Sequence, residues 1–218
     1  MVCRSKVNNV IALCLNLLII VLEIIPIYMM RHVPLKDLII FYTEDSNLLL
    51  LLASILMVIA MLRRLKNGET VPQWVRAFRY ITTCLVGVTF FTVVFILTPM
   101  MGGGLKYSLL EGSSLYLHFL CPVLAMILLI FFEKKPKLPW KSALWALIPT
   151  GIYTLVLVPL NILRIVDGPY PFLKVYEQSI GMDLFWILVM GVGAFLVAYI
   201  LWGLNRIASR KERKEEEV

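Results

Sequence analysis

Apolar residues along this chain fall into six long runs separated by short polar segments. Each run is long enough to cross a bilayer as a helix, which takes roughly 20 residues. The fifth run contains Pro149 and Pro159, which predict a kink or local unwinding because proline removes a backbone donor. The predicted spans are 8–30, 37–62, 76–99, 115–132, 142–164 and 182–204. We therefore expect an all-α polytopic membrane protein with six transmembrane helices.

Composition supports this class and leaves no room for a soluble domain. The chain has 218 residues, of which 60% are hydrophobic and 16% charged, and its mean hydropathy is +0.85. A soluble domain of this length does not bury so much apolar surface. We expect one transmembrane domain over residues 1–207, with the first span retained, and a charged cytoplasmic tail over 208–218.

Charge distribution predicts the orientation and excludes one class of partner. The formal charge is +7, but the basic residues lie between the apolar runs and form no single patch, so we expect no nucleic-acid partner. Sixteen Lys and Arg residues fall on the side of the N-terminus, and five fall on the other side. This asymmetry predicts that both termini are cytoplasmic. The oligomeric state is left open.

Polar residues interrupt the start of the second run, which reads FYTEDSNLLLLLASILM from Phe41. At about 100° per residue, Thr43, Asn47 and Ser54 lie near one line of a helix, and Ser46 lies beside it. Asp45 points almost the opposite way. The sequence thus predicts a polar stripe that enters the membrane from the outer side.

Further polar residues are expected at the same depth on other spans, whereas the inner halves of the spans are nearly all apolar. Intramembrane polar groups of this kind indicate a wet cavity or a cluster that joins helices. They are His118 on the fourth span, Glu23 on the first, Asn161 and Arg164 on the fifth, and Tyr170 in the following loop.

The residue inventory limits the chemistry of such a site. Two histidines cannot form a His-rich zinc centre, although a zinc site of His118, Glu23 and Asp45 is conceivable. No metal or other cofactor is expected. A hydroxyl nucleophile with a histidine base remains, and Thr43 with His118 is the candidate pair. The alternative for Thr43 is a hydroxyl that bonds to a carbonyl of its own helix.

Three motifs carry a resemblance to a known family. They are FYTEDSNLL from Phe41, HFLCPVLAMILLIFFE from His118 and YPFL from Tyr170. In order and spacing they resemble the androgen-induced protein and ADTRP family of integral membrane hydrolases, and more closely its bacterial relatives. The resemblance implies a six-helix fold that hydrolyses fatty acid esters of hydroxy fatty acids. It also implies that Thr43 is the nucleophile and His118 the base.

With this resemblance, the sequence predicts an intramembrane lipid ester hydrolase of a bacterial-type cell membrane, which forms an acyl-threonine and clears it with water. An amphiphilic ester would enter from the outer leaflet. Ser46 or Asn47 would donate to the oxyanion. Glu23, Glu44 or Asp45 would orient His118, and Asn161, Arg164 and Tyr170 would contact the substrate, with Arg164 holding an anionic group. The alternatives are a transporter or binding protein with an outer-facing polar cavity, an acyltransferase with the same Thr–His pair, and a membrane scaffold.

Overall fold

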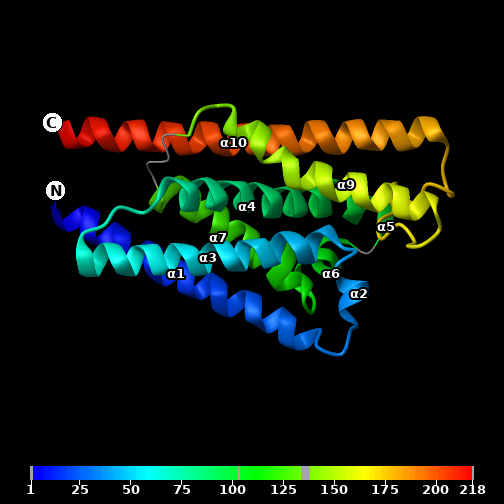
Figure 1. Cartoon of the computed structure of the whole chain (residues 1–218), viewed down its shortest axis with the longest axis horizontal. Coiled ribbons are helices and arrows are strands. Elements are labelled where there is room, and N and C mark those ends of the chain that lie inside the picture. The colour runs from blue at the N-terminus through cyan, green and yellow to red at the C-terminus, as the bar shows by residue number, and fades with distance from the viewer. Residues whose placement is uncertain (1, 103, 134–137, 218) are drawn as a thin grey trace.

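A computed structural model describes residues 2–102, 104–133 and 138–217, and in this part of the chain it is all-helical (Figure 1). Helices make up 81% of the structure, and the described residues form no strand. Within these described residues, six helical segments are long and apolar enough to cross a membrane, which confirms the predicted number of spans and indicates a multi-pass membrane protein. They are Val7–Met29, Tyr42–Asn67, Gln73–Met101, Leu115–Phe132, Ser142–Ile162 and Ile180–Ser209.

Three of the spans are single helices, and three are built from consecutive segments. The single helices are α1 (Val2–Met29), α3 (Tyr42–Asn67) and α10 (Ile180–Glu217). The third span joins α4 (Gln73–Thr92), η1 (Val93–Leu97) and α5 (Thr98–Met101); the fourth joins η2 (Leu115–Leu120), α7 (Cys121–Ile127) and η3 (Leu128–Phe132); the fifth joins α8 (Ser142–Trp145) and α9 (Leu147–Ile162). The connections contain α2 (Leu35–Leu38), α6 (Gly104–Leu110) and η4 (Pro171–Leu173).

The second span begins later than its apolar run predicts. Residues 35–38 form the separate short helix α2, and α3 starts only at Tyr42, after Phe41 in extended conformation. Thr43 therefore lies in the first turn of α3 and not deeper in a longer helix. Glu44 and Asp45 share that turn, where the positive end of the helix dipole stabilises negative charge.

The bundle has two distinct ends. α1 begins and α10 ends on one side, which we call the terminal end, and α3 begins at the opposite end (Figure 1). α4 is the central helix, because it packs against α3, α7, α8 and α10 and its span is the most buried of the six. Many large apolar side chains on the outside of the bundle are exposed, as expected for a lipid-facing surface.

Irregular helix marks the third, fourth and fifth spans. η1, η2 and η3 are π-helical, a form that is rare and frequent at functional sites. The fifth span breaks between α8 and α9, three residues before Pro149, whereas Pro159 lies inside α9. The interruption predicted for this span is therefore present near its start.

The predicted tail continues the last helix, because α10 extends to Glu217 without a break. Lys134, Lys135 and Lys137, which contribute to the basic asymmetry, and Val218 lie outside the described residues.

Candidate functional site

A cavity of about 340 Å³ lies between α3, the third span, α9, the loop around η4, and α10. Most of its wall is apolar, with a minority of hydroxyl groups. The hydroxyl-bearing residues in its lining are Tyr42, Thr43, Thr89, Thr92, Thr150, Tyr153, Thr154 and Tyr170. A volume of roughly 300–1,000 Å³ with few polar groups is typical of a small-molecule site.

Thr43 lies at the wall of this cavity and contacts Tyr170. Its side chain is 6% exposed. Its backbone N–H donates to the Tyr170 phenol at 3.3 Å, and its hydroxyl is 3.5 Å from the same oxygen. The partner of the Thr43 hydroxyl is thus on a different segment. The structure does not contain the alternative, in which this hydroxyl bonds to a carbonyl of its own helix.

Aromatic packing and one glycine hold Tyr170 in place. Its ring stacks on Phe172 with centroids 5.3 Å apart, and Phe172 packs in turn on Trp186 of α10. Gly168 allows the loop to close, because a Cβ there would lie 2.4 Å from the carbonyl oxygen of Leu173. Burial raises the pKa of the Tyr170 phenol to about 12, so the group stays neutral and can donate a proton to a hydrogen bond at physiological pH.

A second set of hydroxyls attaches α9 to the start of α3. The Tyr42 hydroxyl is 2.8 Å from that of Thr150, and the Tyr153 hydroxyl donates to the carbonyl of Ile40 at 2.8 Å. These hydroxyl groups were not among the site residues predicted from the sequence. The available signal was the spacing of Thr150, Tyr153 and Thr154, which places three hydroxyls on one face of a helix.

The predicted oxyanion donors, Ser46 and Asn47, have other partners. The Ser46 hydroxyl donates to the carbonyl of Thr43 at 3.0 Å and lies 3.0 Å from the hydroxyl of Thr89. The Asn47 amide donates to the carbonyls of Thr43 and Leu117, at 2.8 and 3.1 Å. Neither residue lines the cavity, so in this structure both join helices.

Pro122 explains why Asn47 is needed. In η2 each amide bonds to the carbonyl five residues earlier, as Cys121 does to Tyr116. Pro122 has no N–H for the next carbonyl in this series, that of Leu117. The Asn47 amide donates to that carbonyl instead. This bond attaches the fourth span to α3 at Leu117, the residue before His118.

His118 lies on η2, outside the lining of the cavity, and is half-buried. Its Nδ1 is 2.9 Å from the carbonyl of Ser108. A carbonyl only accepts, so Nδ1 carries the proton and Nε2 is left as the basic nitrogen. Thr43 and His118 form no direct hydrogen bond in the structure, and their helices are connected through Asn47.

The three candidate orienting carboxylates do not contact His118, whose ring is oriented by the Ser108 carbonyl. Glu23 is buried, with 2% of its surface exposed, and lies beside the thiol of Cys121. Glu44 and Asp45 lie at the start of α3, near Tyr153. Within the described part of the chain, no three His, Cys, Asp or Glu side chains come together as the conceivable zinc site would require.

The other two predicted substrate contacts lie outside the cavity lining. Asn161 supports the loop, because its amide donates to the carbonyl of Val166 and its carbonyl accepts from the amide of Val175. Arg164 is exposed, has a positive φ of 58°, and places its guanidinium 4.5 Å from the ring centre of Tyr176.

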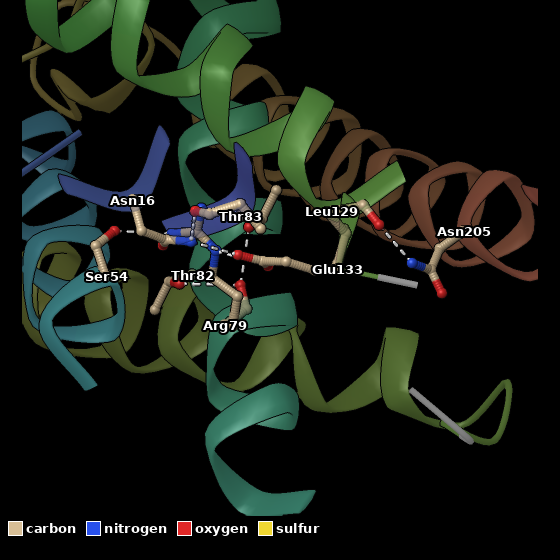
Figure 2. Close-up of polar contacts among 9 residues, drawn as sticks. Asn16, Ser54, Arg79, Thr82, Thr83, Leu129, Glu133 and Asn205 are labelled. Carbon is tan, nitrogen blue, oxygen red and sulfur yellow. Dashed lines mark hydrogen bonds and ion pairs between the residues drawn. The ribbon is translucent and has the colours of Figure 1, made fainter. Parts of the chain in front are cut away.

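Figure 2 shows a second polar cluster around Arg79. Arg79 lies near the start of α4, which is at the terminal end (Figure 1), where the spans were expected to be apolar. Arg79 of α4 and Glu133 form an ion pair at 3.1 Å, with side chains only 1% and 6% exposed. Arg79 also donates to Ser54 at 2.9 Å, and Asn16 donates to Glu133 at 2.9 Å. The expectation that the inner halves of the spans are nearly all apolar is therefore wrong. In the sequence, Arg79 and Glu133 stand at the ends of their apolar runs, but in the structure they pair inside the bundle.

Comparisons of the chain with protein-family models, with curated proteins and with solved structures give no match.

Proposed function

We propose that this protein is an intramembrane lipid ester hydrolase with Thr43 as its nucleophile. The observation that supports this most is the position of the Thr43 hydroxyl, which lies at the wall of a largely apolar cavity beside the neutral phenol of Tyr170. The apolar wall suits an acyl chain, and the two hydroxyls supply an attacking oxygen and a hydrogen-bond donor at one place. The family resemblance assigns the same role to Thr43.

In the proposed reaction, the Thr43 oxygen attacks the ester carbonyl, the alkoxide leaves with a proton, and an acyl-threonine remains. Water then hydrolyses this intermediate to a fatty acid and restores the hydroxyl. Tyr170 donates to the oxyanion in place of Ser46 and Asn47, whose hydrogens are engaged elsewhere. An acyltransferase would share the first step and use another alcohol in the second.

His118 is the proposed base, because its Nε2 is the nitrogen free to accept a proton. It must approach Thr43 when substrate is bound, since catalytic hydrogen bonds often tighten only in that complex. The Asn47 link keeps the two helices in register for this step.

The basic asymmetry supports an orientation with the terminal end in the cytoplasm and the cavity toward the outer leaflet. A reporter that is active only outside the cytoplasm, attached after Val218, should show no activity. Strong activity would reverse the orientation.

Labelling with a lipophilic fluorophosphonate, followed by mapping of the modified residue, tests the chemistry. We expect the label on Thr43, its loss in Thr43→Ala and His118→Ala, and partial retention in Thr43→Ser. Thr92→Ala is the matched control, because Thr92 also lines the cavity but has no bond to Tyr170. Full labelling and hydrolysis by a folded Thr43→Ala variant would refute the proposal.

The polar cluster around Arg79 supports a second candidate, a transporter, because polar groups now occur in both halves of the bundle. Uptake of a solute by proteoliposomes that survives Thr43→Ala but is lost in Glu133→Gln would favour transport over hydrolysis.

A further inference from the structure

The cavity at Thr43 reaches the outside of the bundle between α9 and α10. Four of the residues that line it are also exposed on the surface of the bundle, two on each of these helices. They are Gly151 and Leu155 on α9, and Ile187 and Gly191 on α10. Leu155 is 76% exposed, which is more than a side chain facing only an enclosed cavity would be. Both helices belong to membrane spans, so this opening faces the hydrocarbon of the bilayer.

The opening lies at the level of the Thr43 hydroxyl. Thr150, the residue before Gly151, contacts the hydroxyl of Tyr42, the residue before Thr43. Gly151 lies roughly 16 Å from the end of α9, and Gly191 lies as far from the start of α10, at a rise of about 1.5 Å per residue. These two helix ends are at the same end of the bundle (Figure 1). A chain that enters between the helices therefore reaches Thr43 without first crossing the membrane surface.

The two glycines at the opening are required neither by the backbone nor by close packing. Gly151 and Gly191 lie inside their helices, and neither has a positive φ. A Cβ at either position would meet no atom within 4 Å. Glycine inside a helix is also less favourable than alanine. What the missing side chains do provide is space, because they leave the opening clear on both of the helices that form it.

The lining of the cavity limits what can enter through this opening. None of the described residues that line it carries a charge, so a charged group would lose its hydration there without gaining a counter-charge. The side chains nearest the opening, such as Leu155, Ile187 and Met190, are apolar. Hydroxyl groups occur further in, at Thr43 and Tyr170. This order suits a molecule with a hydrocarbon chain next to a neutral polar group.

We infer that the opening between α9 and α10 admits one long acyl chain of a neutral ester directly from the bilayer, and that Gly151 and Gly191 determine which chains fit. The inference rests on the proposed function, because it places the ester group of the same molecule at Thr43. Any charged part of the substrate stays outside the cavity. Gly151 and Gly191 are thus specificity-determining residues and take no part in the chemical step.

The first experiment measures binding without hydrolysis. The full chain in lipid nanodiscs is irradiated with a hexadecyl methyl ether that carries a photoreactive diazirine in mid-chain, and the modified residues are mapped by mass spectrometry. We expect labelling of Met190, which lines the cavity, to saturate with probe concentration. Labelling of Leu188, which is exposed on the same helix but does not line the cavity, should rise without saturation. Labelling of Met190 that is absent or does not saturate would overturn the inference.

Gly191→Phe and Gly193→Phe form the matched pair of variants. Both glycines lie on α10 with open space around them, but only Gly191 lines the cavity. We expect Gly191→Phe to weaken the saturable labelling of Met190 at least about tenfold, because the added carbons occupy a hydrophobic pocket. Gly193→Phe should leave this labelling unchanged. Equal effects of the two variants would contradict a role for the opening.

Hydrolysis by the same proteins separates failure of this inference from failure of the proposed function. With nitrophenyl butyrate and nitrophenyl palmitate as substrates, we expect Gly191→Phe to slow hydrolysis of the long-chain ester at least about tenfold and to spare that of the short-chain ester. Equal loss for both esters would overturn the inference, because the added ring would then disturb Thr43 itself. A wild type that binds the ether saturably but hydrolyses neither ester would support the opening and refute the proposed function.

Discussion

Replacing Glu133 by alanine should strongly destabilise the fold, because it leaves the guanidinium of Arg79 buried without its counter-charge. In the wild type, Glu133 accepts from Arg79 at 3.1 Å and from Asn16 at 2.9 Å. Both side chains of the ion pair are almost fully buried. Solvent therefore screens the pair very little, and removing one partner removes both hydrogen bonds at once.

Breaking a buried ion pair from one side costs about 3–5 kcal/mol. At roughly 2–4 °C per kcal/mol for a chain of this size, the unfolding midpoint should fall by about 6–20 °C. Reversible unfolding in mixed micelles with increasing dodecyl sulfate measures the free-energy change. The double variant Arg79→Met, Glu133→Leu should be more stable than Glu133→Ala, because it leaves no unpaired buried charge.

The chain contains a matched control in the exposed pair of Lys174 and Glu177, whose atoms are 2.9 Å apart but whose side chains are 33% and 66% exposed. Glu177→Ala should leave the midpoint unchanged within error, since solvent screens exposed pairs. If Glu133→Ala destabilises the protein no more than Glu177→Ala does, the ion pair is not buried in the bundle as described.

Three further results are expected. Gly168→Ala should lower the rate of ester hydrolysis by displacing Tyr170, because the new Cβ would lie 2.4 Å from a backbone oxygen. The control is Gly193→Ala, which has open space around it and should leave hydrolysis unchanged. Asn47→Leu leaves the buried carbonyl of Leu117 without its donor, whereas the carbonyl of Thr43 keeps the Ser46 hydroxyl, so unfolding in dodecyl sulfate should show a loss of about 1–3 kcal/mol. The pKa of Tyr170, about 12, keeps the phenol protonated between pH 7 and pH 10, so the rate of enzymatic hydrolysis should not fall in that window. A fall centred at about pH 10, the ordinary tyrosine pKa, that disappears in Tyr170→Phe would contradict the buried environment of this group.

The six spans and the buried stripe of α3 were predictable from the sequence, because both follow from local periodicity. Thr43, Ser46, Asn47 and Ser54 are all buried, as their angular spacing indicates. The start of α3 was not predictable in this way, since the apolar residues before Tyr42 extend the hydrophobic run through a break in the helix.

Contacts between distant segments were harder to predict. Tyr170 was expected near substrate, but its pairing with Thr43, 127 residues away, depends on which helices are neighbours. The same applies to Arg79 and Glu133, which are 54 residues apart and each lie at one end of an apolar run. A charged residue in that position is read from sequence as part of a loop, and only the packed bundle shows that the two meet.

The link between Asn47 and Pro122 has a consequence for related sequences. The amide of Asn47 donates to the Leu117 carbonyl, the acceptor in the η2 series that has no backbone donor because residue 122 is proline. An ordinary residue at position 122 would bring its own N–H to that carbonyl and leave one amide hydrogen of Asn47 without this acceptor. We therefore expect positions 47 and 122 to covary, so that homologues lacking the proline also lack the asparagine. An alignment of relatives should show the two positions changing together.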